Sequence, residues 1–234
     1  MLDNAFEALT KFDWGTDLAA LAPIEDAVIS SHGKPDDRQQ LENRLIAALK
    51  GNLTRDAQDY VCRKLATVGT ASAVPVLAGL LVNKDNSHMA RFALERIPAP
   101  EAAEALRDAL LKVSGSLKIG VISSLGGRRD AAATAALSGL LKDRDSATAR
   151  AAALALGALG NAEAAKALQA EFKAAGGNAA AIIDALLHCA ESLLAEQKVS
   201  EARPIYEALN DAQQPRLIRL AATRGLLACA GRQA

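Results

Sequence analysis

Pairs of adjacent leucines recur along the chain at a constant interval. They are Leu80-Leu81, Leu110-Leu111 and Leu140-Leu141, each pair 30 residues after the one before. A fixed period in the range of about 20–50 residues is typical of solenoids, in which each repeat is one supersecondary unit. Such a unit cannot bury both of its faces alone, so its stability comes from stacking on its neighbours. The period therefore predicts a pile of repeated units.

The stretch 124–168 shows the repeated unit most fully. Apolar side chains within 136–141 recur at the spacing of one helical stripe, and the polar run 143–146 then interrupts them. That run supplies side chains able to cap the N-terminus of a second helix, which we expect at 146–159. Gly160 and Asn161 after it suit a left-handed helix end. The unit is therefore predicted to be a helical hairpin.

Alanine and leucine dominate this pattern, with hydrophobic residues at 50% and aromatic residues at 3% of the chain. Alanine has the highest helix propensity, and its small side chain lets neighbouring helix axes approach closely. Gly120, inside an expected helix at 116–125, is predicted to mark a close crossing. A chain of 234 residues holds about seven hairpins of this period. The sequence thus predicts an all-α protein.

The line SLGGRRDAAATAALSGLLKDRDSATARAAALALGALG resembles a HEAT-like repeat of the phycobilisome-lyase type. The resemblance rests on the leucine-glycine end, Asp130 after it, the leucine pair, the acidic turn, and Arg150 on the second helix. It implies a right-handed α-solenoid of about seven stacked helical hairpins. In HEAT proteins an Asp and an Arg so placed bridge successive hairpins, which implies the pairs Asp85 with Arg91 and Asp145 with Arg150.

Three parts of the chain differ in character. Residues 1–35 are expected to form a capping hairpin, in which Trp14 covers the open end of the stack, with a functional Trp14 as the alternative. Residues 36–196 form the HEAT-like array, with one linker at Gly176-Gly177. Residues 197–234 resemble a tetratricopeptide hairpin through the spacing of Ala202 and Tyr206. We interpret this last part as continuous with the array, since about 35 residues hardly support a separate domain.

Charge and composition argue against several classes of partner. The formal net charge is zero, without the basic excess of a nucleic-acid-binding domain, and few aromatic rings are available for base stacking. The segment 1–35 is acidic, with six carboxylates against two lysines. The chain has neither an apolar run of membrane-spanning length nor a signal peptide, which favours the cytoplasm. The segment 88–106, however, resembles HEAT arrays of large bacterial proteins, often exported, so a fragment of one would imply export.

Neither a metal site nor a catalytic centre is predicted. Cys62, Cys189 and Cys229 lie far apart and beside apolar neighbours, so small buried side chains are favoured over a disulfide or metal framework. The three histidines are also scattered, without zinc-site spacing. The chain lacks a phosphate-binding Gly-rich loop and a nucleophile elbow. We therefore expect no cofactor, no metal and no enzymatic activity.

The register does predict a binding face. The second helix of each hairpin usually lines the concave surface of such arrays. The side chains that this rule gathers, most of them basic, are Tyr60, Arg63, His88, Arg91, Lys118, Arg150 and His188. A row of this kind suits a protein or peptide, including an acidic one, although solvated helix surface explains the same charges.

The leading hypothesis is a non-catalytic scaffold that binds a protein or peptide partner on its concave face. The first alternative is a HEAT-type enzyme, similar to an alkylpurine DNA glycosylase or a phycobilin lyase. A resemblance to the glycosylases implies a basic cleft lined by several aromatic residues and a carboxylate. One tryptophan and a net charge of zero do not favour such a cleft. The second alternative is a spacer module from a larger bacterial protein. Oligomeric state is not predicted.

Overall fold

The computed structural model describes residues 1–174 and 180–231, and within these ranges all regular structure is helical. Short 3₁₀ turns, labelled η, precede or follow several α-helices. The elements are α1 (Leu2–Leu9), η1 (Leu18–Leu21), α2 (Ala22–Ser30), α3 (Pro35–Lys50), α4 (Arg55–Val68), η2 (Ala71–Ala73), α5 (Val74–Leu80), α6 (Ser87–Arg96), α7 (Pro100–Leu110), α8 (Gly115–Gly127), η3 (Ala131–Ala133), α9 (Thr134–Gly139), η4 (Leu140–Lys142), α10 (Ser146–Leu159), α11 (Ala162–Ala174), α12 (Ala180–Ala195), α13 (Val199–Leu209) and α14 (Arg216–Gly231).

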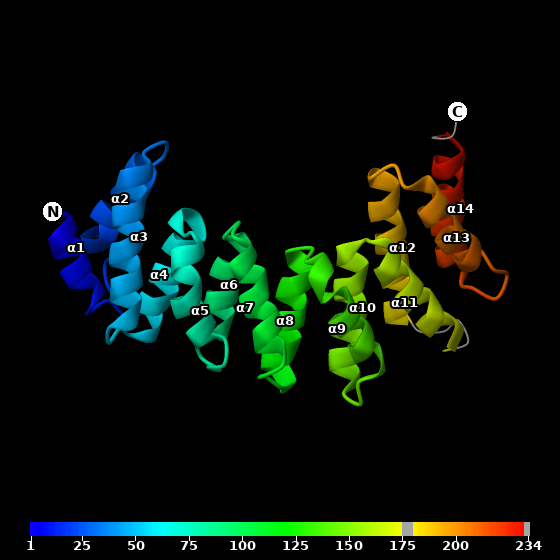
Figure 1. The fold of residues 1–234 in the computed structure, drawn as a ribbon, viewed down its shortest axis with the longest axis horizontal. Helices are drawn as coiled ribbons and strands as arrows, with labels where there is room; N and C mark the ends of the chain where they lie inside the picture. Colours follow the sequence, from blue (N-terminus) through cyan, green and yellow to red (C-terminus); the bar gives the residue numbers. More distant parts are fainter. Residues whose placement is uncertain (175–179, 232–234) are drawn as a thin grey trace. The chain divides into compact units, whose positions relative to one another are not determined.

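Consecutive helices pair into hairpins, and the described residues form seven of them, from α1–α2 to α13–α14 (Figure 1). This confirms the predicted all-α class and the number of hairpins, and it is consistent with an α-solenoid. The predicted linker Gly176-Gly177 lies outside the described residues.

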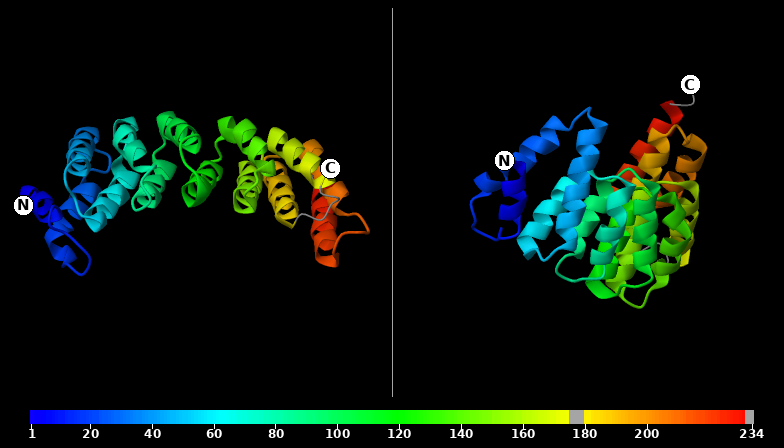
Figure 2. Two further views of the ribbon diagram at one scale, coloured as in Figure 1. Left: turned by 90° about the horizontal axis from the view of Figure 1, so that it is seen from below. Right: turned by 60° about the vertical axis from the view of Figure 1, so that its left-hand side comes forward.

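The chain divides into two compact units, Met1–Ser124 and Leu125–Ala234. In the first unit α4 packs on α6, and α5 packs on both α3 and α7. In the second unit α10 packs on α12, and α11 packs on both α9 and α13. First helices therefore contact first helices and second helices contact second helices, which is the layering of stacked hairpins. Figure 2 shows the hairpins of each unit following one another in chain order. The predicted boundaries after 35 and 196 fall inside these units and stay predictions.

Local sequence accounts for where the helices begin and end. The Thr54 side chain accepts a hydrogen bond from the Ala57 amide at the start of α4, and Asp145 accepts one from the Ala147 amide at the start of α10. Gly160 ends α10 with φ +60°, as predicted for a left-handed cap. The first helix of the repeated unit, indicated by the stripe within 136–141, is the short α9 flanked by two 3₁₀ turns, because helix ends readily tighten to i→i+3 bonding.

Small residues lie where successive second helices cross. A Cβ built on Gly157 of α10 would lie 2.8 Å from both the Cα and the carbonyl oxygen of Ala185 in α12. A Cβ on Gly126 would likewise lie 2.9 Å from the Cα of Ala155. The backbones are therefore in direct contact, which only glycine permits. This agrees with the expectation that alanine and glycine allow close approach of the axes.

Gly120 has a different role from the predicted helix crossing. A Cβ at this position would lie 2.6 Å from Cζ of Arg91, so the glycine makes room for a guanidinium group. Arg91 in α6 donates from Nη1 to the Gly120 carbonyl at 3.0 Å and to Ser124 Oγ at 3.3 Å. Ser124 Oγ in turn donates to Glu95 at 2.6 Å. Arg91 therefore bridges successive hairpins as expected, but through α8 rather than through the predicted partner Asp85.

A buried carboxylate joins two hairpins in the first unit. Glu42 of α3 is fully buried, and its Oε1 accepts hydrogen bonds from the Thr70 amide at 2.6 Å and the Thr70 hydroxyl at 2.9 Å. Gln39 donates to its other oxygen at 3.3 Å. A buried charge is tolerated only when it is hydrogen-bonded in this way. The bonds hold α3 against the start of η2.

The cysteines occupy the core. Cys62, Cys189 and Cys229 are buried free thiols, which confirms the interpretation that they are small apolar side chains. Burial raises the pKa of both the Cys62 and the Cys189 thiols to about 12.

Trp14 does not cover the end of the stack, and this expectation was wrong. Its side chain is 91% exposed, whereas Leu9, Leu21 and Ile24 fill the interface of the first hairpin. Trp14 lies in the turn between α1 and η1, where Gly15 adopts φ +82°. Aliphatic side chains close the hairpin, so the indole is left at the surface.

We predict that adding one methyl group at the α10–α12 crossing weakens the fold. Gly157→Ala is expected to lower the free energy of unfolding by about 1–3 kcal/mol, because the new Cβ overlaps the Ala185 backbone. The matched control is Gly79→Ala in α5, where a Cβ meets nothing within 4 Å. It should raise the free energy of unfolding by about 0.5–1 kcal/mol through helix propensity. Urea titration followed by circular dichroism measures both, and an unchanged Gly157→Ala would contradict the close crossing.

The exposure of Trp14 predicts its fluorescence, which is unambiguous because the chain has one tryptophan. The folded protein should emit close to the wavelength of free N-acetyltryptophanamide, with acrylamide quenching nearly as strong. Unfolding in guanidinium should change both properties little. An indole that covers an apolar interface would instead emit at shorter wavelength and be protected from the quencher.

Candidate functional site

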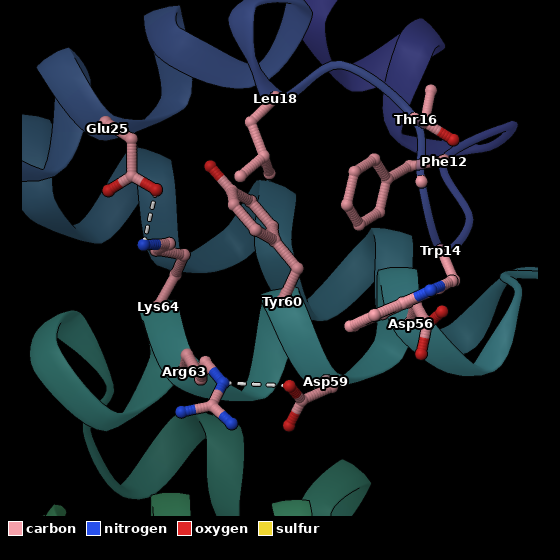
Figure 3. Close-up of a pocket in the computed structure, with 11 residues that line it drawn as sticks. Phe12, Trp14, Thr16, Leu18, Glu25, Asp56, Asp59, Tyr60, Arg63 and Lys64 are labelled. Carbon is pink, nitrogen blue, oxygen red and sulfur yellow. Dashed lines mark hydrogen bonds and ion pairs between the residues drawn. The ribbon is translucent and has the colours of Figure 1, made fainter.

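A cavity of about 600 Å³ opens on the first unit between the turn after α1 and the exposed face of α4 (Figure 3). Its walls come from two successive hairpins. The residues that line it are Phe12, Trp14, Gly15, Thr16, Leu18, Glu25, Asp56, Asp59, Tyr60, Arg63 and Lys64. Three of the chain's seven aromatic residues are therefore in one place.

Helix α4 supplies one wall through its periodicity. Asp56, Asp59, Tyr60, Arg63 and Lys64 are separated by three or four residues, so they share a face of the helix. Thr54 begins this helix, and its hydroxyl also donates to the Phe12 carbonyl. The same residue therefore fixes both the start of α4 and the turn opposite it.

The turn that carries Trp14 is held by its own polar side chains. Thr16 donates from Oγ1 to the Asp13 carbonyl at 2.6 Å and accepts from the Asp13 amide at 3.1 Å. The Asp13 carboxylate accepts from the Trp14 amide at 2.9 Å. Such side-chain-to-backbone bonds are typical of tight turns. They leave the indole projecting from a defined backbone, and Figure 3 shows it beside Asp56.

The aromatic side chains form the floor and rim of the cavity. The Tyr60 and Phe12 rings lie with centroids 6.0 Å apart at 54°, a tilted arrangement that aromatic pairs favour. Tyr60 is 8% exposed and its hydroxyl donates to the Leu21 carbonyl at 3.4 Å. Burial raises the pKa of the Tyr60 phenol, and the neighbouring Glu25 carboxylate raises it further. Tyr60 is therefore uncharged at ordinary pH, and its ring forms an apolar floor.

Charged groups surround this aromatic floor. Glu25 pairs with Lys64 at 2.5 Å, and Asp59 pairs with Arg63 at 2.8 Å. Lys64 Nζ also lies 4.8 Å from the centroid of the Tyr60 ring. Asp56 is 3.5 Å from Arg55, an exposed residue that does not line the cavity. The lining thus holds three carboxylates and two cations, and both of these cations already have carboxylate partners.

The structure brings together only part of the predicted binding row. Tyr60 and Arg63 line the cavity. His88 and Lys118 lie on α6 and α8, outside its lining, and Arg91 is the interhelical bridge described above. Arg150 and His188 are exposed on α10 and α12 of the second unit. All seven are on second helices, as the register predicted, while their role as a binding face stays a prediction. Asp145 caps α10, bonding the Ala147 amide and the Thr148 hydroxyl.

Sequence reasoning missed Phe12, Leu18 and the carboxylates of the cavity, and it placed Trp14 in the wrong environment. The low aromatic content argued against a platform for base stacking, but an average over the chain does not show whether its few aromatic residues lie together. The available signal was the segment DWGTD, in which one large aromatic residue stands inside a turn of Asp, Gly and Thr. A turn of that composition is solvated, so an aromatic side chain within it has no core to enter.

Among the described residues, no group of three or more His, Cys, Asp or Glu side chains is arranged to hold a metal ion. Within the same ranges, every helix is too short or too polar to cross a bilayer.

Comparison with known proteins gives a match to a family and matches to solved structures. The HEAT repeat family matches residues 113–187. No curated protein matches the sequence. The structure of human deoxyhypusine hydroxylase in complex with glycerol resembles the chain with 16% identity and a TM-score of 0.40, covering 98% of this chain and 96% of that one.

The structural match corrects one expectation. The lack of compact catalytic motifs predicts no enzymatic activity, and this expectation does not stand, since a matched structure is that of a hydroxylase. In stacked hairpins, side chains far apart in sequence can face one space, so missing local motifs are no ground for excluding catalysis. The match itself assigns no activity to this chain. The family match does identify part of the architecture: residues 113–187 match HEAT repeats, and the described helices of each unit stack as hairpins.

Proposed function

We propose that this HEAT-repeat chain is a binding module whose first unit holds a segment of a protein or peptide partner in the aromatic cavity. One observation carries the proposal: an indole that is 91% exposed stands over a cavity of about 600 Å³ lined by Phe12, Leu18 and Tyr60. Exposing a tryptophan to water is unfavourable, and tryptophan is prominent among the residues that dominate binding energy at interfaces.

The size and lining of the cavity support a small part of a larger partner as the occupant. A volume of about 600 Å³ lies within the range of about 300–1,000 Å³ found for ligand sites. Apolar surface from Phe12, Trp14 and Leu18 offers area to bury, and charged groups at the edge supply orientation. A short extended segment with one or two anchoring side chains suits a cavity that has an apolar interior and a charged edge.

The basic row predicted from the register remains a separate hypothesis for an acidic partner. Two of its cations already contact groups of the chain itself, because Arg63 pairs with Asp59 and Arg91 binds the Gly120 carbonyl. We therefore centre the proposal on the cavity, where the Trp14 indole is open to a partner.

The glycosylase-like alternative gains one supporting observation. Phe12, Trp14 and Tyr60 beside Asp56 and Asp59 form the combination of aromatics and carboxylates that composition alone did not favour. The acidic segment 1–35 around them opposes an approaching phosphate backbone, however. Tight, salt-sensitive binding of duplex DNA that is lost on Trp14→Ala would favour this alternative.

The experiment is a selection of random displayed peptides on the intact chain, followed by affinity measurements on variants. Trp14→Ala is predicted to weaken the selected peptides by about 30-fold, the effect of losing about 2 kcal/mol at an interface anchor. Leu111→Ala is the matched control, since this side chain is 85% exposed in the same unit and outside the cavity lining. It should leave the affinity unchanged.

Thermal unfolding of both variants should match that of the unaltered protein, because both side chains are exposed. Selected peptides that bind Trp14→Ala as well as they bind the unaltered chain would refute the cavity as the binding site.

A further inference from the structure

We propose that the group taken into the cavity is a positively charged side chain, lysine or arginine, from an extended segment of a partner protein. This inference rests on the proposed function and names the chemistry of its ligand. It follows from how this chain uses its own aromatic rings, from the carboxylates beside Trp14, and from the charge of the neighbouring segment.

Three aromatic rings of the first unit already have a cation over them. Arg44 lies 4.2 Å from the centroid of Phe6, Arg96 lies 3.7 Å from that of Phe92, and Lys64 lies 4.8 Å from that of Tyr60. Arg63 lies 5.4 Å from the Phe92 ring as well. A cation within about 6 Å of a ring centroid is attracted by the ring quadrupole. The environment of this unit therefore repeatedly pairs rings with cations.

Trp14 is the ring best suited to such a contact, because indole has the strongest attraction for cations among these side chains. Within the described residues, the cations that lie over aromatic rings lie over Phe6, Phe92 and Tyr60, and not over Trp14. Its faces are open to solvent, and Figure 3 shows it directed toward the edge of the cavity beside Asp56. A cation from a partner would complete the arrangement that the other rings make internally.

The carboxylates favour the same charge. Within the part of the chain that the structure describes, Asp56 forms its ion pair with the exposed Arg55 at 3.5 Å, a long contact that is easily exchanged. Asp59 and Glu25 add two further carboxylates to the lining, and the segment 1–35 carries six against two lysines. Opposite charge across an interface raises association rates and suppresses wrong partners.

A neutral apolar side chain is a poorer occupant than a cation. It would displace water from Asp56 without replacing the lost hydrogen bonds, which is unfavourable for a charged group. An acidic side chain would meet carboxylates whose own cationic partners are already engaged. The alkyl stem of lysine or arginine, by contrast, packs on Phe12 and Leu18 while its head reaches Asp56.

The test uses acetylated and amidated peptides of sequence Gly-Leu-X-Leu-Gly, with X as lysine, arginine, norleucine or glutamate. Binding is followed by the fluorescence of Trp14 in the intact chain. The lysine and arginine peptides should bind about fivefold more tightly than the norleucine peptide at low salt, and the glutamate peptide more weakly still. Raising the ionic strength from about 0.01 M to about 1 M should remove most of this preference.

Asp56→Asn should reduce the preference for lysine over norleucine about threefold, consistent with one lost charge contact at a partly exposed site. Asp108→Asn removes the same charge from an exposed position of α7 outside the cavity and is expected to have no effect. Circular dichroism confirms that both variants are folded.

The outcomes separate this inference from the proposed function. Equal affinity for the lysine and norleucine peptides overturns the inference, while displayed peptides that still need Trp14 keep the binding function. A response of Trp14 to duplex DNA and to none of the peptides overturns it in favour of a nucleic-acid ligand. Failure of every peptide, together with selected binders insensitive to Trp14→Ala, overturns both proposals.

Discussion

Contact between the backbones of successive second helices is the constraint on which the rest of the structure depends. Where α10 meets α12, Gly157 leaves no room for even a methyl group beside Ala185. Close approach of this kind maximises dispersion contacts along the row and fixes how far each hairpin can rotate on the next. Polar bridges add to it at chosen points: Arg91 reaches the Gly120 carbonyl, and buried Glu42 binds Thr70 of the following hairpin. A polypeptide that contains few large aromatic residues can thereby remain ordered through many small, repeated interfaces.

The sequence predicted the repeated parts well because periodicity is a local property. Leucine pairs 30 residues apart, capping residues and helix-terminating glycines were enough to place the hairpins, and α10 begins and ends at the predicted residues. The departures occur where a side chain is governed by a neighbour distant in sequence. Gly120 serves an arginine 29 residues away, and Arg91 finds α8 rather than Asp85. The candidate site was harder to predict than the fold. The repeat register placed Tyr60 and Arg63 correctly on a second helix. The environment of Trp14, however, depends on which side chains fill the first hairpin, and residue spacing does not encode that.

The aromatic cavity illustrates how a repeat array can acquire a specific surface without changing its architecture. Its α4 wall is an ordinary helical face, and its opposite wall is a turn stabilised by Asp13 and Thr16. On the α4 wall Arg63 also lies over the Phe92 ring of α6, but the turn takes no part in the stacking of second helices on one another. Side chains of such a turn can therefore vary without weakening the interfaces that hold the hairpins together, which is why HEAT repeats identify an architecture far more readily than an activity.

The Thr54 hydroxyl has one further consequence. By bonding the Phe12 carbonyl while capping α4, it ties the two walls of the cavity, which come from different hairpins, to a single side chain. An occupant that touches both walls acts in parallel with this tie, so its binding free energy opposes separation of the two hairpins. Conversely, any excursion that parts them dismantles the site at once. Ligand retention and the cohesion of these two layers are thus thermodynamically linked, and a change in either alters the other.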